Sequence, residues 1–304
     1  MSYLTDSRGD LVQYLWPSEE CKRLFTDTPI AEAQRWEIFP TTVEDMVDWA
    51  EVIIDKNAVN TFRNRVLIYK ASPTGSISTD VVYPVTLRLN GYIDRMDIKR
   101  LGNWDGNADN IRFAHQFITL VPGSSRDAWL ATVGCLNTTA TFISRALSIP
   151  LANETPFKNK ISLQRKVFYQ HPRIKPITAS FADDPKNWLA NVPADWTLDD
   201  EVVVGRKTDK GKIVHLSHMM LSPGDFVEVS AGFDIVFTRD PSTSRNTIKI
   251  YLAFEHILSI LPAQDQLLPV ETTKKRKECE SPNKGPTIQK KHHALNFSDG
   301  LEQT

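Results

Sequence analysis

Two segments in which apolar and polar residues alternate strictly constrain the fold of this chain most. The apolar positions are Phe233, Ile235 and Phe237 in the first segment and Ile248, Ile250, Leu252 and Phe254 in the second. A period of two is that of a β-strand with one buried face. Residues 240–244, Asp-Pro-Ser-Thr-Ser, lie between the segments and are typical of a turn. The pattern therefore predicts a long antiparallel hairpin.

Shorter strand patterns precede this hairpin and indicate a larger β-structure. They lie at residues 66–69, 85–89, 111–121, 202–204 and 213–216. The last two flank residues 208–211, Thr-Asp-Lys-Gly, in which Asp and Gly tolerate the dihedral angles of a tight turn. We expect a mixed, mainly β fold, an antiparallel β-sandwich or barrel, in a globular domain at residues 61–268.

Two helical patterns accompany the strands. Thr41 and Glu44 have the spacing of a capping box, and apolar residues then recur at helical spacing as far as Ile54. This predicts the main helix of a helical N-terminal segment, residues 1–60, packed on the β-rich body. A second helix, inserted in the body, is predicted to begin at Ser124. Its apolar stripe consists of Trp129, Val133, Leu136, Ala140, Ile143 and Leu147.

The last part of the chain, residues 269–304, is polar and basic. Lys, Ser, Pro, Thr and Gln dominate there, and so few apolar residues cannot offset the entropy of an ordered chain. We therefore expect a disordered tail. Its two basic clusters consist of Lys274, Lys275, Arg276, Lys277, Lys290 and Lys291. They match a bipartite nuclear-import signal, which predicts an import carrier as partner and a location in nucleus and cytoplasm; a solubilising tail is the alternative.

Residues 158–175 are the strongest candidate for a nucleic-acid site in the body, because they include no acidic residue. The candidate contact residues are Lys158, Lys160, Arg165, Lys166, Phe168, Tyr169, Arg173 and Lys175. Cations neutralise phosphates and aromatic faces stack on unpaired bases, so the combination favours single-stranded nucleic acid or nucleoprotein. The alternation of Ile161, Leu163 and Val167 also fits an ordinary strand with a solvated basic face.

The sequence shows no recognisable catalytic, metal or cofactor motif. Residues 105–109 match the start of a calcium loop, but position 110 is Asn rather than Gly and position 116 is Gln rather than Glu. His215 and His218 lie beside a predicted strand, where that spacing places them on opposite faces. The acidic residues at 195–201 are expected to be solvated in a polar linker. The sequence thus predicts no metal, no cofactor and no enzyme activity.

Cysteine usage and hydropathy indicate a reducing location without membrane insertion. The three cysteines, Cys21, Cys135 and Cys279, have neither the number nor the spacing of a disulfide framework or a zinc site. No apolar run approaches the roughly 18 residues of a membrane span, and the N-terminus lacks a secretion-signal pattern. With 36 Lys and Arg against 37 Asp and Glu, nucleic-acid binding requires a local basic patch.

The layout, a β-rich body followed by a hydrophilic basic tail, is similar to that of several virus-encoded proteins. Plant-virus movement proteins, rhabdovirus matrix proteins and small capsid proteins share it, without a common motif. The resemblance implies a non-enzymatic interaction protein of viral type that enters the host nucleus and acts on nucleic acid or nucleoprotein, with homo-oligomer formation left open. The alternatives are a cellular nuclear adaptor that binds only proteins and an enzyme with a motif-free site.

Overall fold

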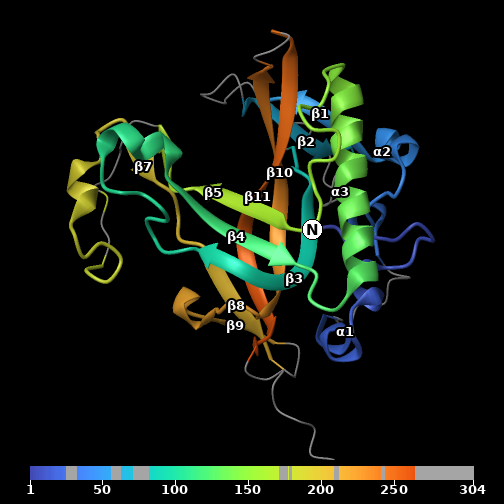
Figure 1. Ribbon diagram of the computed structural model, residues 1–304, viewed down its shortest axis with the longest axis horizontal. Helices are drawn as coiled ribbons and strands as arrows, with labels where there is room; N and C mark the ends of the chain where they lie inside the picture. The colour runs from blue at the N-terminus through green and yellow to red at the C-terminus, as the bar shows by residue number, and fades with distance from the viewer. Residues whose placement is uncertain are drawn as a thin grey trace, which may run out of the picture. The chain divides into compact units, whose positions relative to one another are not determined.

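The computed structural model describes residues 1–24, 33–55, 63–70, 82–170, 177, 180–208, 212–240 and 244–263. In this part of the chain the predicted mixed, mainly β fold is confirmed (Figure 1). The α-helices are α1 (Ser18–Leu24), α2 (Val43–Trp49) and α3 (Arg126–Leu147). The strands are β1 (Ala50–Ile54), β2 (Arg65–Tyr69), β3 (Thr86–Asp97), β4 (His115–Val121), β5 (Ile161–Lys166), β6 (Phe168–Gln170), β7 (Trp196–Leu198), β8 (Val203–Lys207), β9 (Ile213–His215), β10 (Phe226–Arg239) and β11 (Asn246–Leu261). The 3-10 helices are η1 (Val12–Leu15), η3 (Arg35–Glu37), η5 (Ala108–Phe113), η6 (Trp188–Asn191) and η7 (His218–Met220).

Five strands close into a barrel in the order β10-β3-β4-β5-β11. Neighbouring strands are antiparallel except β5 and β11, which are parallel, and the β10–β11 pair closes the ring. β10 returns to lie beside β3, the first of three successive strands, which makes the barrel a Greek key. A five-stranded Greek-key barrel is the arrangement of the OB-fold. The predicted barrel is therefore present, although it is mixed rather than fully antiparallel.

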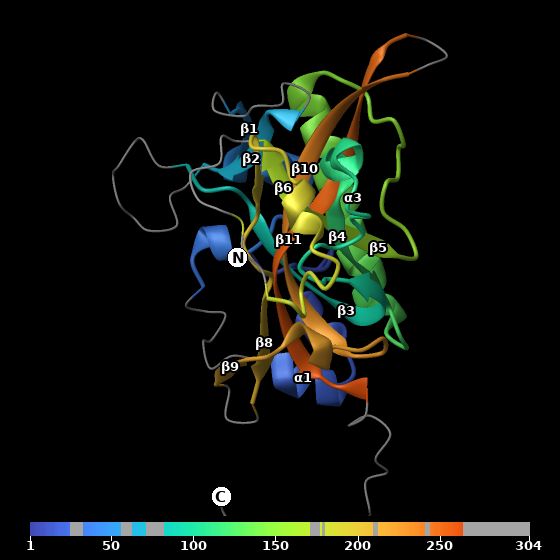
Figure 2. The same ribbon diagram turned by 90° about the vertical axis from the view of Figure 1, so that its left-hand side faces the viewer.

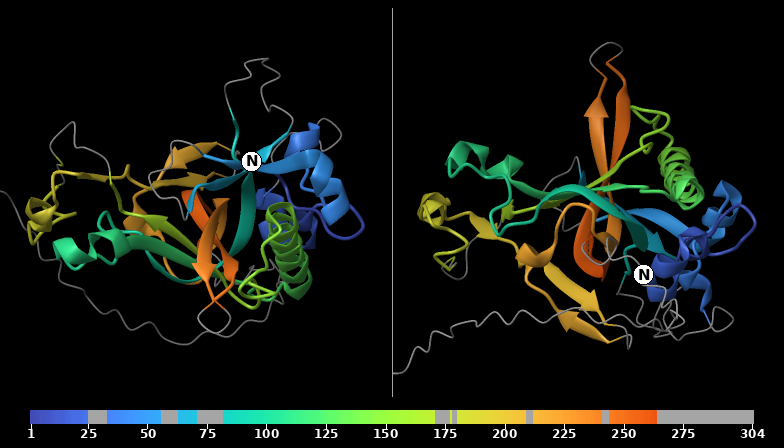
Figure 3. Two further views of the ribbon diagram at one scale, coloured as in Figure 1. Left: turned by 90° about the horizontal axis from the view of Figure 1, so that it is seen from above. Right: turned by 60° about the horizontal axis from the view of Figure 1, so that its bottom comes forward.

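The sheet continues beyond this ring at both margins. β2 pairs with β10 and β1 with β2, while β8 lies parallel to β11 and β9 pairs with β8. β10 and β11 also run on together past Gly232, which pairs with the first residue of β3, and they form a two-stranded ribbon beyond the pairing of β10 with β2 (Figure 3). Figure 2 shows β8 and β9 at the same end of the sheet as α1. The predicted long hairpin is thus both a barrel wall and a ribbon.

The barrel interior is filled by the residues that alternate inward along its strands. Leu163 of β5 lies opposite Ile118 of β4 on one side and Leu252 of β11 on the other. All three side chains are fully buried. Each such burial stabilises the fold by about 1.5–3 kcal/mol.

The long helix α3 packs along one side of the sheet with its apolar stripe inward (Figure 1). Trp129, Leu136, Ala140 and Ile143 are buried as the helical spacing predicts. The indole Nε1 of Trp129 donates a hydrogen bond to the carbonyl oxygen of Lys158 at 3.0 Å. The helix begins at Arg126, two residues later than predicted.

The N-terminal segment differs in detail from the predicted helix. The cap is Thr42 rather than Thr41, and its hydroxyl oxygen accepts a hydrogen bond from the backbone N–H of Asp45 at 3.1 Å. The helix α2 ends at Trp49, and residues 50–54 form strand β1 instead of continuing the helix. The β-branched side chains of β1 favour a strand once β2 is available for pairing, which the local period could not indicate.

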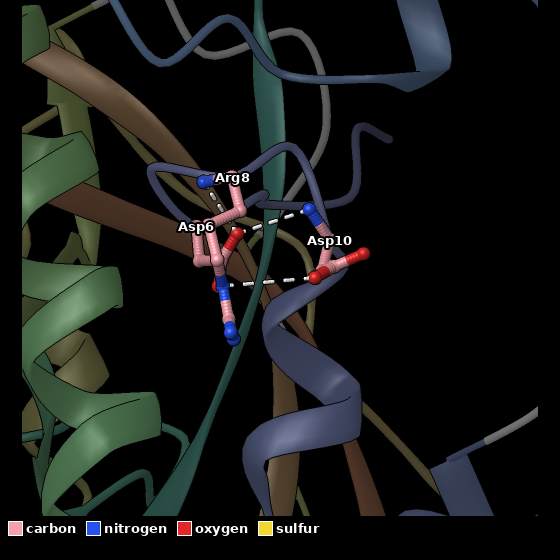
Figure 4. A network of polar contacts seen from close by, with 3 residues as sticks. All are labelled: Asp6, Arg8 and Asp10. Carbon is pink, nitrogen blue, oxygen red and sulfur yellow. Dashed lines mark hydrogen bonds and ion pairs between the residues drawn. The ribbon is translucent and has the colours of Figure 1, made fainter.

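A hydrogen-bonded turn closes the first residues of the chain (Figure 4). The carboxylate of Asp6 accepts hydrogen bonds from the backbone N–H of Arg8 at 2.9 Å and of Asp10 at 3.0 Å. Desolvation opposes ionisation of Asp6, but these hydrogen bonds and the Arg8 side chain hold the pKa of that carboxyl below its ordinary value. The turn therefore prefers the charged form of Asp6.

A second, smaller apolar cluster lies next to the ends of β4 and β5. It contains Leu101, Trp104, Ile111, Ala114, Val167, Phe168, Leu189 and Val192. The 3-10 helices η5 and η6 and the strand pair β6–β7 contribute to it. Residues 111–113, predicted as strand, belong to η5, and the strand starts only at His115.

Candidate nucleic-acid interface

The outward face of β4 and β5 presents a row of polar and aromatic side chains. Ile118 and Leu120 of β4 point into the core, so the residues that alternate with them lie on the outer face. These outer residues are His115 and Phe117, which are half-buried, and Thr119, which is 1% exposed. The β5 residues directly opposite them are Lys166, Gln164 and Ser162. The hydroxyl oxygens of Thr119 and Ser162 lie 3.3 Å apart, which confirms that both strands share this face.

Phe117 is the central side chain of this face. The guanidinium carbon of Arg95, from β3, lies 5.6 Å from the centroid of its ring. The His115 ring centroid lies 6.2 Å away, with 50° between the ring planes. Arg95 is exposed and, among the described residues, has no ion pair. An aromatic ring beside a free cation suits the stacking of an unpaired base and the neutralisation of its phosphate.

The sequence prediction missed Arg95, His115 and Phe117. It identified a strand at residues 111–121 without asking which residues faced outward. The signal that could have found them is the same alternation, because His115, Phe117 and Thr119 alternate with buried apolar positions.

Two of the predicted cations are paired with aspartates. Lys160 Nζ lies 2.7 Å from Oδ2 of Asp94, and Arg165 Nη2 lies 2.7 Å from Oδ2 of Asp199. Arg165 also donates from Nη1 to the carbonyl oxygen of Asp200 at 2.7 Å, and only 13% of its side chain is exposed. Arg165 therefore anchors the segment after β7 to the barrel and has little surface left for a ligand.

This anchoring corrects the expectation for the acidic residues at 195–201. Asp199 is half-buried rather than solvated, because it packs against Arg165. Desolvation raises the pKa of Asp199, and the charge of Arg165 opposes that rise. Asp199 is therefore structural, whereas Asp195, Asp200 and Glu201 are exposed, as the sequence predicts.

Lys166 and Tyr169 remain available on the same face. Lys166 Nζ lies 5.9 Å from the centroid of the Tyr169 ring, and Tyr169 is exposed. Burial lowers the pKa of Lys166, repulsion from Arg63 lowers it further, and Asp234 opposes both effects. Arg63 Nη1 itself lies 3.0 Å from Oδ2 of Asp234. The cations of this face are thus partly neutralised by the protein's own carboxylates.

The other predicted contact residues do not gather on this face. Phe168 is 2% exposed, and its ring packs against Trp104 with 4.8 Å between centroids, so it offers no face to a base. Lys158 is exposed in the loop before β5. Arg173 and Lys175 lie outside the described residues, as do both basic clusters of the tail.

Other candidate sites carry no ligand-binding geometry in the described part of the chain. The carboxylate of Asp105 accepts hydrogen bonds from the backbone N–H of Asn107 and the side-chain amide of Asn110, as a turn requires. Within the described ranges, no three His, Cys, Asp or Glu side chains are grouped to hold a metal ion. The helices described there lack the length and apolar character needed to cross a membrane.

No protein-family model matches the chain, and no curated protein matches it significantly. Among solved structures, it is similar to gp2.5, a single-stranded DNA-binding protein encoded by bacteriophage T7. The likeness has a TM-score of 0.31 and 13% identity, and it covers 64% of this chain and 97% of that one. Because both values are low, we infer neither fold nor function from this likeness.

Proposed function

We propose that this chain binds single-stranded nucleic acid through the outward face of β4 and β5. The observation that carries the proposal is Phe117 on that face, with the exposed guanidinium of Arg95 over one side of its ring and without an ion pair among the described residues. A base stacked on the ring would place its phosphate within reach of the cation. Stacking needs an unpaired base, so a single strand is favoured over a duplex.

The position of the face within the barrel supports the proposal. In Greek-key barrels of this arrangement, oligonucleotides and oligosaccharides bind on the second and third strands. β4 and β5 are the second and third strands of this barrel. That support is an analogy of fold. The salt dependence of the affinity distinguishes an oligonucleotide from an oligosaccharide, since only a phosphate backbone releases counterions on binding.

We further propose that the chain acts by binding rather than by catalysis, and that it does so in the nucleus as well as the cytoplasm. The support is the sequence alone: the bipartite basic pattern of the tail and the lack of a catalytic motif. A viral role of the movement, matrix or capsid type is the proposed setting. A cellular nuclear adaptor is the first alternative, and an enzyme with a motif-free site is the second.

The test is fluorescence anisotropy with a labelled oligothymidylate and with a duplex of equal length, over a range of salt concentrations. We expect the single strand to bind more tightly, with an affinity that falls as salt rises. Phe117→Ala should weaken binding by about 1–3 kcal/mol. The control is Tyr14→Ala, which removes an exposed aromatic ring from η1. Absence of binding at low salt would refute the proposal and favour the protein-binding adaptor.

A further inference from the structure

We propose that the open edge of β9 binds an extended acidic segment of a partner protein by strand addition. β9 is the last strand of the nine-stranded sheet, and among the described residues it pairs only with β8. Figure 2 shows this hairpin at the margin of the sheet. An unpaired strand edge is a template for another extended chain.

The backbone hydrogen bonds show which groups the open edge presents. The carbonyl of Lys212 and the N–H of Leu216 bond across the hairpin, at 2.8 and 2.9 Å. Alternate residues face the same edge in an antiparallel pair, so Val214 also faces β8. Ile213 and His215 therefore direct their N–H and C=O groups to the open edge. These groups are spaced to pair with the backbone of a peptide.

The side chains around this edge are apolar and unusually exposed. Ile213 of β9 is 62% exposed and Met219 of η7 is 79% exposed. Val203 of β8 and Met220 of η7 are also exposed, as is Val214 of β9, which lies on the opposite face of the strand from Ile213. Exposed apolar groups that gather on a strand edge are typical of an interaction surface. We call these five side chains the β9 surface.

Charge selects the occupant of the β9 surface. The basic residues at 203–220 are Arg206, Lys207, Lys210, Lys212, His215 and His218. The only acidic residue in that stretch is Asp209. Lys212 is exposed and has no ion pair with a described residue, whereas the Nε atom of Arg206 is buried and out of reach of a peptide. An acidic segment pairs with Lys212, whereas a second copy would bring like charges together.

The same stretch favours a peptide over nucleic acid. Its sequence includes no Phe, Tyr or Trp on which a base could stack. Its exposed apolar side chains are aliphatic or thioether groups, which pack against apolar residues of a peptide. A nucleic acid also lacks the alternating N–H and C=O groups that an open strand edge pairs with.

The test uses a fluorescent peptide of alternating aspartate and valine, titrated with the full chain at low salt. We expect saturable binding. The same peptide N-methylated at each central residue keeps its charge but loses its backbone donors, so it should bind at least about tenfold more weakly. Lys212→Glu should also weaken binding. Lys249→Glu is the matched control, since it reverses an exposed lysine of β11 far along the strand from the pairing with β8.

Five outcomes would overturn the proposal. The peptide could fail to bind. The N-methylated peptide could bind as tightly as the unmodified one, or Lys249→Glu could weaken binding as much as Lys212→Glu does, and either result would indicate attraction by charge alone. Oligothymidylate could compete with the peptide and lose affinity in Lys212→Glu, which would make the hairpin a nucleic-acid surface. Sedimentation could show a dimer that Ile213→Asp abolishes, which would assign the edge to a second copy.

Discussion

Replacing Asp94 with Asn should increase the affinity for single-stranded nucleic acid and its dependence on salt. Asp94 Oδ2 lies 2.7 Å from Lys160 Nζ, and the two side chains are 33% and 58% exposed, so the pair is solvated. Lys160 precedes Ser162 by two residues and therefore shares its outward face. The substitution frees Lys160 for a phosphate, at a stability cost of about 0–1 kcal/mol.

The magnitude follows from counting the cations that a single strand can meet. Two cations of the face have no ion pair among the described residues: Arg95 and Lys166. Each phosphate contact contributes about −0.7 to the slope of log K against log salt, which gives about −1.4 for the unaltered chain. One more free cation should steepen the slope by about 0.7.

The assay is anisotropy with oligothymidylate at several salt concentrations, with the slope compared between variants. Asp48→Asn is the control, because it changes the net charge equally at an exposed position of α2. Lys160→Ala should change the slope little, since that lysine is already neutralised. The reasoning fails if Asp94→Asn leaves the slope unchanged, or if Asp48→Asn steepens it by the same amount.

Three further predictions concern stability and location. Trp129→Ala should lower the free energy of unfolding by about 3–5 kcal/mol in a urea titration, because the ring is buried and its Nε1 is hydrogen-bonded. Asp6→Asn should lower the urea midpoint at neutral pH. Because the pKa of Asp6 is lowered in the folded chain, its contribution to stability is present above the ordinary pKa of 3.8 and is lost as pH falls through the folded pKa. The urea midpoints of the variant and the unaltered chain should therefore converge in acid. Alanine at residues 274–277 should move a large fluorescent fusion from nucleus to cytoplasm, and alanine at 290–291 should do so more weakly; nuclear exclusion with the tail intact would contradict the import signal.

Part of the candidate site could be read from the sequence and part could not. Lys166 and Tyr169 were predicted and lie on the outward face, because a basic strand next to an aromatic residue is a local feature. Phe168 has the same local appearance as Tyr169 but is buried against Trp104, which comes from a segment far away in the sequence. Arg165 is likewise neutralised by Asp199, and only folding brings those two residues together.

The sequence by itself determined the elements whose periodicity is strong. The alternation at 233–254 specified β10 and β11, and the apolar stripe that includes Trp129 and Ile143 specified α3. In both cases the pattern is long enough to select one backbone period over the other. The fold class followed from the number of such strand patterns.

Only the tertiary structure decided how the strands join and what the outward face offers. The parallel pairing of β5 with β11 places Leu163 beside Leu252, and the pairing of β10 with β11 closes the barrel. A period of two assigns residues to faces but says nothing about which distant strand lies alongside, since that depends on the packing of the whole core. For the same reason Phe117 gained Arg95 as a neighbour only when β3 and β4 paired, so the candidate interface is a product of the fold.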